Sequence, residues 1–215
     1  MASVSEEIIG IYTRHAEAFD QQRGRSLFER HWLDAFRGRV AGRGHILDIG
    51  CGSGEPIAQY FIGQGHAVTG VDSSVPLIEM CRARAPDQNW IVADMRQLRL
   101  GWRFDGIIAW DSFFHLTAAD QRRMFPIFAA HAAPSAPLMF TSGPAAGEAI
   151  GAFEGETLYH ASLDAREYEQ LLAEAGFEVL DHVAEDPAAG GHTIWLATFS
   201  GAADTRQEEG PSSSP

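Results

Sequence analysis

Apolar residues recur every three or four positions in two segments near the N-terminus, residues 6–19 and 26–37. This spacing is typical of amphipathic helices that bury one face. The apolar positions are Ile8, Ile9, Tyr12 and Phe19 in the first segment, and Leu27, Phe28, Trp32, Leu33 and Phe36 in the second. We therefore expect two helices ahead of the main core.

Short, almost uninterrupted apolar runs follow, and each ends in a turn that leads into a helix-like stretch. The runs are residues 45–49, 67–71, 89–93, 104–110 and 137–141. Signals for a helix start come between them: Ser73 or Ser74 ahead of Pro76, Thr117 with Asp120, and Asp164 with Glu167. Strands that alternate with helices predict a parallel sheet covered on both faces.

The pattern changes after the last predicted helix. Residues 177–183 and 192–200 indicate two strands with only a turn between them, which predicts an antiparallel hairpin at the end of the sheet. The connection over residues 143–163 is rich in Gly and Ala and longer than usual, so we expect a loop that covers or binds a ligand. The polar tail, residues 201–215, is expected to be disordered.

Composition narrows the class of protein. The chain has 215 residues, 45% of them hydrophobic, which is enough for one domain, expected over residues 1–200. The net charge of −13 disfavours nucleic acid and anionic membranes as partners. Seven arginines between Arg14 and Arg43 are interpreted as a solvated helix face. Two cysteines and the absence of a signal or spanning pattern favour the cytoplasm.

The segment ILDIGCGSGEP, residues 46–56, places Gly50, Gly52 and Gly54 directly after a strand. A glycine-rich turn lets backbone amides approach a ligand closely. Glu55 stands where the dinucleotide fingerprint requires a third glycine, and no Gly-Lys-Ser/Thr sequence follows to clamp phosphates. Asp48 would repel a pyrophosphate and attract a cationic ligand; alternatively, it only accepts hydrogen bonds from loop amides.

Four predicted strands end with, or just beside, an aspartate: Asp48, Asp72, Asp94 and Asp111. The carboxyl ends of parallel strands meet at one edge of a sheet. Each aspartate alone could be a loop residue or a helix cap, but their regular placement predicts a shared ligand crevice.

These residues resemble the class I S-adenosylmethionine-dependent methyltransferases. The resemblance runs from about Tyr12 to Ser200 and rests on DIGCGSG, GVDSS, VADM and the AGF before the terminal hairpin. It implies a Rossmann-like α/β fold whose seven-stranded sheet has the order 3-2-1-4-5-7-6 and an antiparallel last strand. Residues 1–40 would form a helical lid, and residues 144–163 an insertion on the substrate side.

The resemblance also implies S-adenosylmethionine as the cofactor and a role for each matching residue. The loop from Asp48 through Gly50, Cys51 and Gly52 would hold the amino-acid end. Asp72 would accept the ribose hydroxyls, with Ser73 beside the adenosine. Asp94 and Met95 would contact adenine, and Trp110 would lie near the methionyl part. Tyr12 and Phe19 match the lid, although simple amphipathic packing explains Phe19 equally well.

Methyl transfer needs a general base only when the acceptor must lose a proton. Asp111 and His115 are four residues apart, so a helix would bring them together and let the carboxylate orient the imidazole. The alternative for His115 is a packed or capping histidine. Tyr159 is a further catalytic candidate and His160 a polar one, whereas His192 is interpreted as an exposed hairpin residue.

Several observations limit the acceptor. The sequence DSFF after the fourth predicted strand lacks the two prolines of family members that methylate nucleobases, which disfavours base methylation. Two cysteines are too few for the thiolates that arsenite methylation requires. The acidic pair of the metal-dependent type is not found around the fifth predicted strand, so we expect no metal. Aromatic residues near the predicted site, namely Phe113, Phe114, Phe153 and Tyr159, favour a small molecule. A catalytically inactive S-adenosylmethionine-binding protein and a nicotinamide-dependent oxidoreductase remain alternatives, and the oligomeric state is open between monomer and weak dimer.

Overall fold

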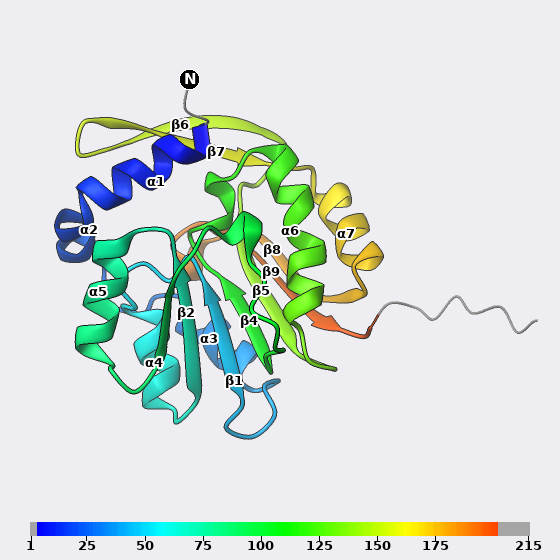
Figure 1. Cartoon of the computed structure of the whole chain (residues 1–215). Helices are drawn as coiled ribbons and strands as arrows, with labels where there is room; N and C mark the ends of the chain where they lie inside the picture. The colour runs from blue at the N-terminus through cyan, green and yellow to red at the C-terminus, as the bar shows by residue number, and fades with distance from the viewer. Residues whose placement is uncertain (1–3, 202–215) are drawn as a thin grey trace, which may run out of the picture.

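A seven-stranded sheet forms the centre of the molecule, in the order β3-β2-β1-β4-β5-β9-β8 (Figure 1). The structure is a computed structural model and describes residues 4–201. Its strands are β1 His45–Ile49, β2 Ala67–Asp72, β3 Asn89–Val92, β4 Gly106–Ala109, β5 Pro137–Ser142, β8 Phe177–Asp186 and β9 His192–Phe199. Strands β1 to β5 run parallel, and β9 pairs antiparallel with both β5 and β8. The predicted order and the antiparallel last strand are confirmed.

Seven α-helices are described within residues 4–201: α1 Val4–Arg14, α2 Ala16–Gln22, α3 Arg30–Arg37, α4 Ile57–Gly63, α5 Val75–Arg84, α6 Ala118–His131 and α7 Ala165–Glu174. Short 3₁₀ turns cover Met95–Gln97, Phe113–His115 and Pro187–Ala189. The predicted cap of α6 is present, because Thr117 Oγ1 accepts a hydrogen bond from the Asp120 amide at 3.2 Å. The first predicted helix is divided into α1 and α2 at His15.

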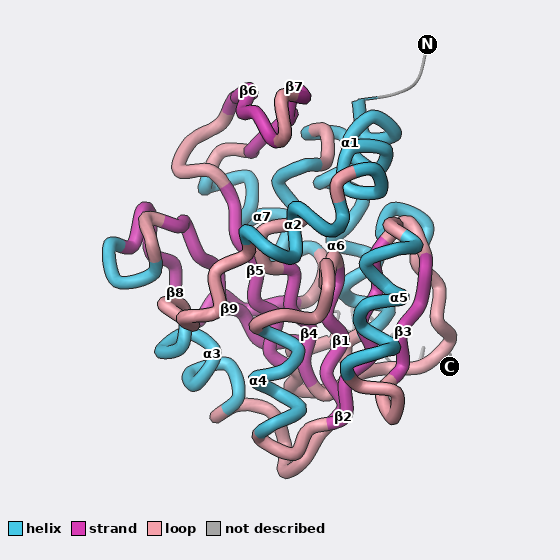
Figure 2. The backbone as a smooth tube through the Cα atoms, turned by 90° about the vertical axis from the view of Figure 1, so that its left-hand side faces the viewer, coloured by secondary structure: helices cyan, strands magenta, loops and turns pink. Residues whose placement is uncertain are grey.

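Side chains that alternate along the central strands enter two separate cores. Leu47 and Ile107 pack with residues of α6 and α7 on one face. Ile46 and Ile108 pack with residues of α3, α4 and α5 on the other. Figure 2 shows the side of the molecule that carries α2, α4 and α5. Two covered faces explain why these strands are apolar at nearly every position.

The expected loop over residues 143–163 is in fact a β-hairpin, which corrects the prediction. Strand β6 Gly147–Phe153 pairs antiparallel with β7 Glu156–Ser162. Both turn residues, Glu154 and Gly155, have left-handed backbones with φ of 50° and 79°, as a two-residue hairpin turn with matching twist requires. The hairpin lies over α1 (Figure 1), and Leu158 and Tyr159 pack against Ile8 and Ile11.

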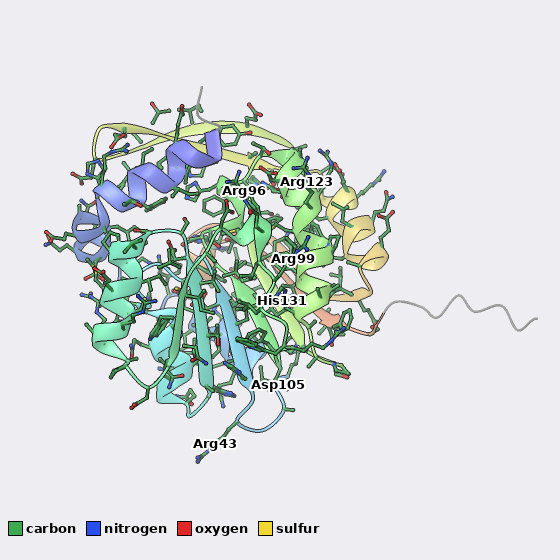
Figure 3. The ribbon with its side chains drawn as sticks, viewed as in Figure 1. Arg43, Arg96, Arg99, Asp105, Arg123 and His131 are labelled. Carbon is green, nitrogen blue, oxygen red and sulfur yellow. The ribbon has the colours of Figure 1, made fainter. Side chains whose placement is uncertain are left out.

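The carboxyl ends of the parallel strands lie at the end of the sheet that faces α1 and the hairpin. In Figure 3, Arg43 and Asp105, which precede β1 and β4, lie at the lower end, and Arg96, which follows β3, lies near the upper end. Because β9 is antiparallel to β5, it begins at the upper end.

Two predictions concern the ends of the chain and its relation to membranes. The predicted disordered tail, apart from Gly201, falls outside the described residues. Over residues 4–201, none of the helices has the length and apolar character that crossing a bilayer requires.

Candidate active site

The glycine loop after β1 has a backbone that side chains could not adopt without strain. Gly50, Gly52 and Gly54 have φ of 76°, 55° and 79°. A Cβ atom at Gly50 would lie 2.2 Å from Ser112 Cβ, and one at Gly52 would lie 2.9 Å from the Phe19 ring. Glycine is therefore needed here both for the left-handed conformation and for close approach of neighbouring groups.

Asp72, at the end of β2, fixes this loop. Its two carboxylate oxygens accept hydrogen bonds from the amides of Gly52, at 3.0 Å, and Ser74, at 2.8 Å. Burial raises the pKa of Asp72, and these amide hydrogen bonds oppose the rise. Each oxygen keeps a second lone pair that can accept a further hydrogen bond.

Two cavities flank the glycine loop, and Phe19 from α2 lies in the wall of both. Both are lined by Phe19, Gly50, Gly52 and Asp111. The larger, about 100 Å³, is also lined by the predicted residues Tyr12, Asp72, Ser73, Asp94, Met95 and His115. The smaller, about 40 Å³, is also lined by Asp48, Cys51 and Trp110. The structure thus brings the predicted strand-end aspartates and the glycine loop together around two neighbouring cavities.

Asp48 lies deep in the wall of the smaller cavity, with 3% of its surface exposed. Burial raises the pKa of its carboxyl to about 7, and the nearby charge of Asp72 adds to the rise. Arg23 partly opposes the shift. A ligand with a positive group in this cavity would stabilise the ionised form of Asp48.

Asp94 and Met95 lie in the wall of the larger cavity, as the sequence predicts, together with Arg96. The carboxylate of Asp94 accepts hydrogen bonds from the Arg96 amide and guanidinium, both within 3.0 Å. Arg96 also lies 3.7 Å from Asp120 of α6. Arg96 thereby connects this wall of the cavity to α6, a contact that the sequence pattern does not reveal.

Helices α1 and α2 close over the larger cavity. The Tyr12 hydroxyl lies 2.9 Å from His115 Nε2, so the lid is joined to the segment after β4. The Tyr12 ring meets Phe19 edge to face at 5.3 Å and stacks on Phe153 of the hairpin at 5.9 Å. Burial raises the pKa of Tyr12, which keeps its hydroxyl protonated.

The expected pairing of Asp111 with His115 does not form. Asp111 has a left-handed backbone with φ of 51°, and the following 3₁₀ turn spans only Phe113–His115, so the helical spacing is lost. His115 Nδ1 lies 3.0 Å from the Tyr159 carbonyl. Burial lowers the pKa of His115 to about 4, so the imidazole is neutral at physiological pH.

Tyr159 lines neither of the two cavities. Its hydroxyl donates a hydrogen bond to Glu148 within the hairpin at 2.7 Å. Phe113, expected near the acceptor, is fully buried among residues of α6 and β5. Phe114 instead lines a third cavity of about 390 Å³ between the hairpin and the end of β5. The hairpin thus keeps Tyr159 away from the glycine loop.

Two side chains near the cavities differ from their interpretation in the sequence. Arg23 is not on a solvated face: its side chain is 17% exposed and lies 3.4 Å from Asp111 and 3.8 Å from Glu29. His192 is not an exposed hairpin residue, because its Nε2 lies 2.8 Å from Asp111 Oδ1. The sequence contains one indication of the position of His192, the first residue of β9. An antiparallel last strand must begin at the edge of the sheet where the parallel strands end.

In residues 4–201, no three His, Cys, Asp or Glu residues are arranged to hold a metal ion.

The fold and the site can now be compared with known proteins. Residues 46–135 match the protein family described as "Methyltransferase domain". A curated O-methyltransferase of Pyrenophora dematioidea is 30% identical over 65% of this chain and 56% of its own length. A dTDP-3-amino-3,4,6-trideoxy-alpha-D-glucopyranose N,N-dimethyltransferase of Streptomyces venezuelae is 26% identical over 69% of this chain and 66% of its own.

Among solved structures, an amino pentose methyltransferase from Micromonospora echinaspora with bound S-adenosylmethionine has a similar fold. The TM-score is 0.68 at 19% identity, over 86% of this chain and 95% of that one. The chain spans between 39% and 66% of the length of the curated relatives it matches. The chain thus shares a methyltransferase domain over residues 46–135, and its strand order and fold are similar to those of solved S-adenosylmethionine-dependent methyltransferases.

Proposed function

We propose that the protein transfers a methyl group from S-adenosylmethionine to an oxygen, nitrogen or carbon atom of a small molecule. The observation that carries this proposal is the pair of cavities around the glycine loop, closed by Tyr12 and Phe19. The match of residues 46–135 to the methyltransferase domain supports it. The proposal includes a cytoplasmic location, which the two cysteines favour, and no nucleic acid or membrane as partner, which the charge of −13 favours.

The residues around the two cavities fit this cofactor. Asp48, Gly50, Cys51 and Gly52 would hold its amino-acid end, because backbone amides and a carboxylate meet there. Asp72 would accept the ribose hydroxyls with its remaining lone pairs, with Ser73 beside the adenosine. Asp94 and Met95 would contact the adenine, and Trp110 the methionyl part. When bound, S-adenosylmethionine supplies an electrophilic methyl group for in-line displacement.

The protein itself would contribute position and shielding from water. Tyr12 and Phe19 cover the loop, and a covered site excludes water from the methyl group. Holding the acceptor in line with the methyl carbon accounts for much of the rate in such reactions. The small cavities favour a small acceptor over a polymer. Two relatives of this chain act, by their names, on an amino sugar and an amino pentose, which supports this size class.

Isothermal titration with S-adenosylhomocysteine tests the cofactor site. We expect binding by the wild-type protein and a loss of at least tenfold in affinity for Asp72→Ala, because a buried acceptor of hydrogen bonds is removed. Asp181→Ala, on an exposed position of β8, is the matched control. Circular dichroism establishes that both variants fold. Wild-type protein that binds no S-adenosylhomocysteine contradicts the proposal.

Label transfer tests catalysis. The protein is incubated with isotopically labelled S-adenosylmethionine and a small-molecule extract of its source cells, and mass spectrometry identifies any compound that gains the label. A labelled small molecule is expected. Binding of S-adenosylhomocysteine without any labelled product would instead indicate a binding protein that lacks catalysis.

A further inference from the structure

Asp111 is held in an unusual conformation at the meeting point of the two cavities. Its backbone is left-handed, with φ of 51°, which is uncommon for a residue with a side chain. Its amide donates a hydrogen bond to Thr141 Oγ1 at 2.9 Å, which fixes the segment against β5. Strained residues of this kind cluster at functional sites, and here the strained residue carries a carboxylate that lines both cavities.

His192 is joined to Asp111 and oriented by its other nitrogen. Nδ1 lies 2.6 Å from the Ala189 carbonyl, so this nitrogen carries a proton. Nε2 lies 2.8 Å from Asp111 Oδ1, which is within ion-pair distance. The ring stacks on Phe28 at 5.6 Å and lies 5.4 Å from Trp110. The imidazole therefore has a fixed tautomer and a fixed direction.

The other charged groups around this pair are few. Arg23 approaches Asp111 Oδ2 at 3.4 Å from the end of α2, and Glu29 lies 3.8 Å from Arg23. Asp186, opposite His192 on β8, is occupied by hydrogen bonds from Trp32 and from the Ala188 amide. The hydrogen bond to Asp111 raises the pKa of His192, while burial and Arg23 oppose the rise.

Two buried polar groups beside the pair have no hydrogen-bond partner within the described part of the chain. They are the Trp110 indole nitrogen and both carboxylate oxygens of Glu29, whose residue surface is 1% exposed. Leaving such groups unpaired is costly, and a bound polar molecule would provide partners. Trp110 lines the smaller cavity beside Asp111, whereas Glu29 has an ion pair with Arg23. The indole nitrogen therefore indicates a polar ligand at the Trp110 and Asp111 side of the smaller cavity.

We propose that Asp111 removes a proton from the methyl acceptor, that His192 is the residue that positions it, and that the methylated atom is a hydroxyl oxygen or an amine nitrogen. This inference rests on the proposed methyltransferase function and names the class of its acceptor. His115 is unsuited to the same task, because one of its nitrogens contacts the Tyr159 carbonyl and the other contacts the Tyr12 hydroxyl.

The atoms and electrons of this step balance. A lone pair of the acceptor oxygen or nitrogen forms a bond to the methyl carbon. The bond from that carbon to sulfur breaks, and its electron pair stays on sulfur. In the form in which His192 is protonated only at Nδ1, the proton of the acceptor passes to the Asp111 carboxylate, and from there it can move to His192 Nε2 across the 2.8 Å contact. Solvent takes the proton afterwards, because both side chains are about a quarter exposed.

The test uses methyl-labelled S-adenosylmethionine with three aromatic probes of similar size: phenol, benzylamine and indole, whose acceptor atoms are oxygen, nitrogen and carbon. Initial rates are measured from pH 5.5 to 9 for the wild type, Asp111→Asn and His192→Gln. His45→Gln, at the opposite end of the sheet, is the control for loss of an imidazole. Titration with S-adenosylhomocysteine establishes that each variant keeps the cofactor site.

We expect methylation of phenol or benzylamine but not of indole, with a rate that rises as His192 loses the proton on Nε2. Asp111→Asn should lower the rate at pH 8 by 10²-fold or more, as for other general bases. His192→Gln should lower it about tenfold and move the rising part of the pH profile, while S-adenosylhomocysteine affinity changes less than threefold.

Three results would overturn the inference. Unchanged pH profiles in both variants would remove Asp111 and His192 from the proton transfer and leave the proposed function intact. Methylation of indole alone would do the same. No labelled product from any probe, from a protein that binds S-adenosylhomocysteine, would overturn the inference together with the catalytic part of the proposed function.

Discussion

Asp48 makes the stability of the fold depend on pH. Its carboxyl is buried near the end of β1, and burial raises its pKa to about 7. The folded state then holds this proton more tightly than the unfolded chain does. The contribution to stability is complete below about pH 4 and is lost as the pH rises through 7. Three pKa units correspond to at most about 4 kcal/mol.

Asp48→Asn should therefore flatten the pH dependence of the free energy of unfolding. Between pH 5 and 8, urea denaturation should show wild-type stability falling with pH relative to the variant, which becomes the more stable form near pH 8. Asp181→Asn, on the exposed part of β8, should follow the wild type. Parallel curves for the wild type and Asp48→Asn would show that Asp48 is ionised throughout.

Gly52 meets the Phe19 ring so closely that a methyl group has no room. Gly52→Ala should strain a backbone with φ of 55° and displace Phe19, because its Cβ would lie 2.9 Å from that ring. We expect S-adenosylhomocysteine affinity to fall at least tenfold by isothermal titration. Gly63→Ala, in α4 with open space around it, is the control and should bind normally. Equal affinities would show that the loop tolerates a side chain.

At the scale of elements, the N-terminal helices and the hairpin are joined into one cover. Glu156 of β7 pairs with Arg14 and with His15, the latter at 2.6 Å, and Gln22 of α2 donates a hydrogen bond to Glu154 at 2.6 Å. Tyr12 and Phe153 stack between them. Because the two segments are more than 130 residues apart, their docking is a tertiary property that neither segment encodes alone.

Glu156→Ala should loosen this cover without unfolding the domain. Exposed ion pairs add little to global stability, so the melting temperature should change by no more than a degree or two. Hydrogen exchange in α1 and β7 should become at least threefold faster, because the contacts between them are local. Glu167→Ala breaks a similar pair with Arg122 between α6 and α7 and serves as control. Unchanged exchange in α1 would show that apolar packing alone holds the cover.

At the scale of the whole molecule, the sequence predicts the sheet better than the cover or the site. Strands buried on both faces, such as β1 and β4, have continuous apolar runs, and their predicted positions agree with the structure to within a few residues. The hairpin was missed because β6 is mostly exposed and consists of Gly, Ala, one Glu and single apolar residues, so it lacks alternation. Its turn, Glu154-Gly155, was the one local signal.

The candidate site likewise contains residues that the sequence predicts and residues that it does not. Residues on the strand ends and the glycine loop could be placed from the sequence, since topology brings strand ends to one edge. The partner of Asp111 could not, because a left-handed backbone at that residue removed the helical spacing on which the pairing with His115 depended. The burial of Arg23 could not be predicted from the sequence for another reason, because it depends on how α2 docks over the sheet.

If the cover and the sheet form one binding unit, ligand binding at the loop should stabilise both. Phe19 lines two cavities that are each smaller than the several hundred Å³ of usual ligand sites. We therefore expect an S-adenosylmethionine-sized ligand to displace Phe19 and to be enclosed by α1, α2 and the hairpin. At 100 times its dissociation constant, S-adenosylhomocysteine should add about 2.7 kcal/mol to the free energy of unfolding. Hydrogen exchange should slow in α1 and β7 as well as in the glycine loop. In α7, which packs on the far side of the sheet, exchange should slow only as much as the increase in global stability requires. Protection restricted to the loop would show that the cover does not take part in binding.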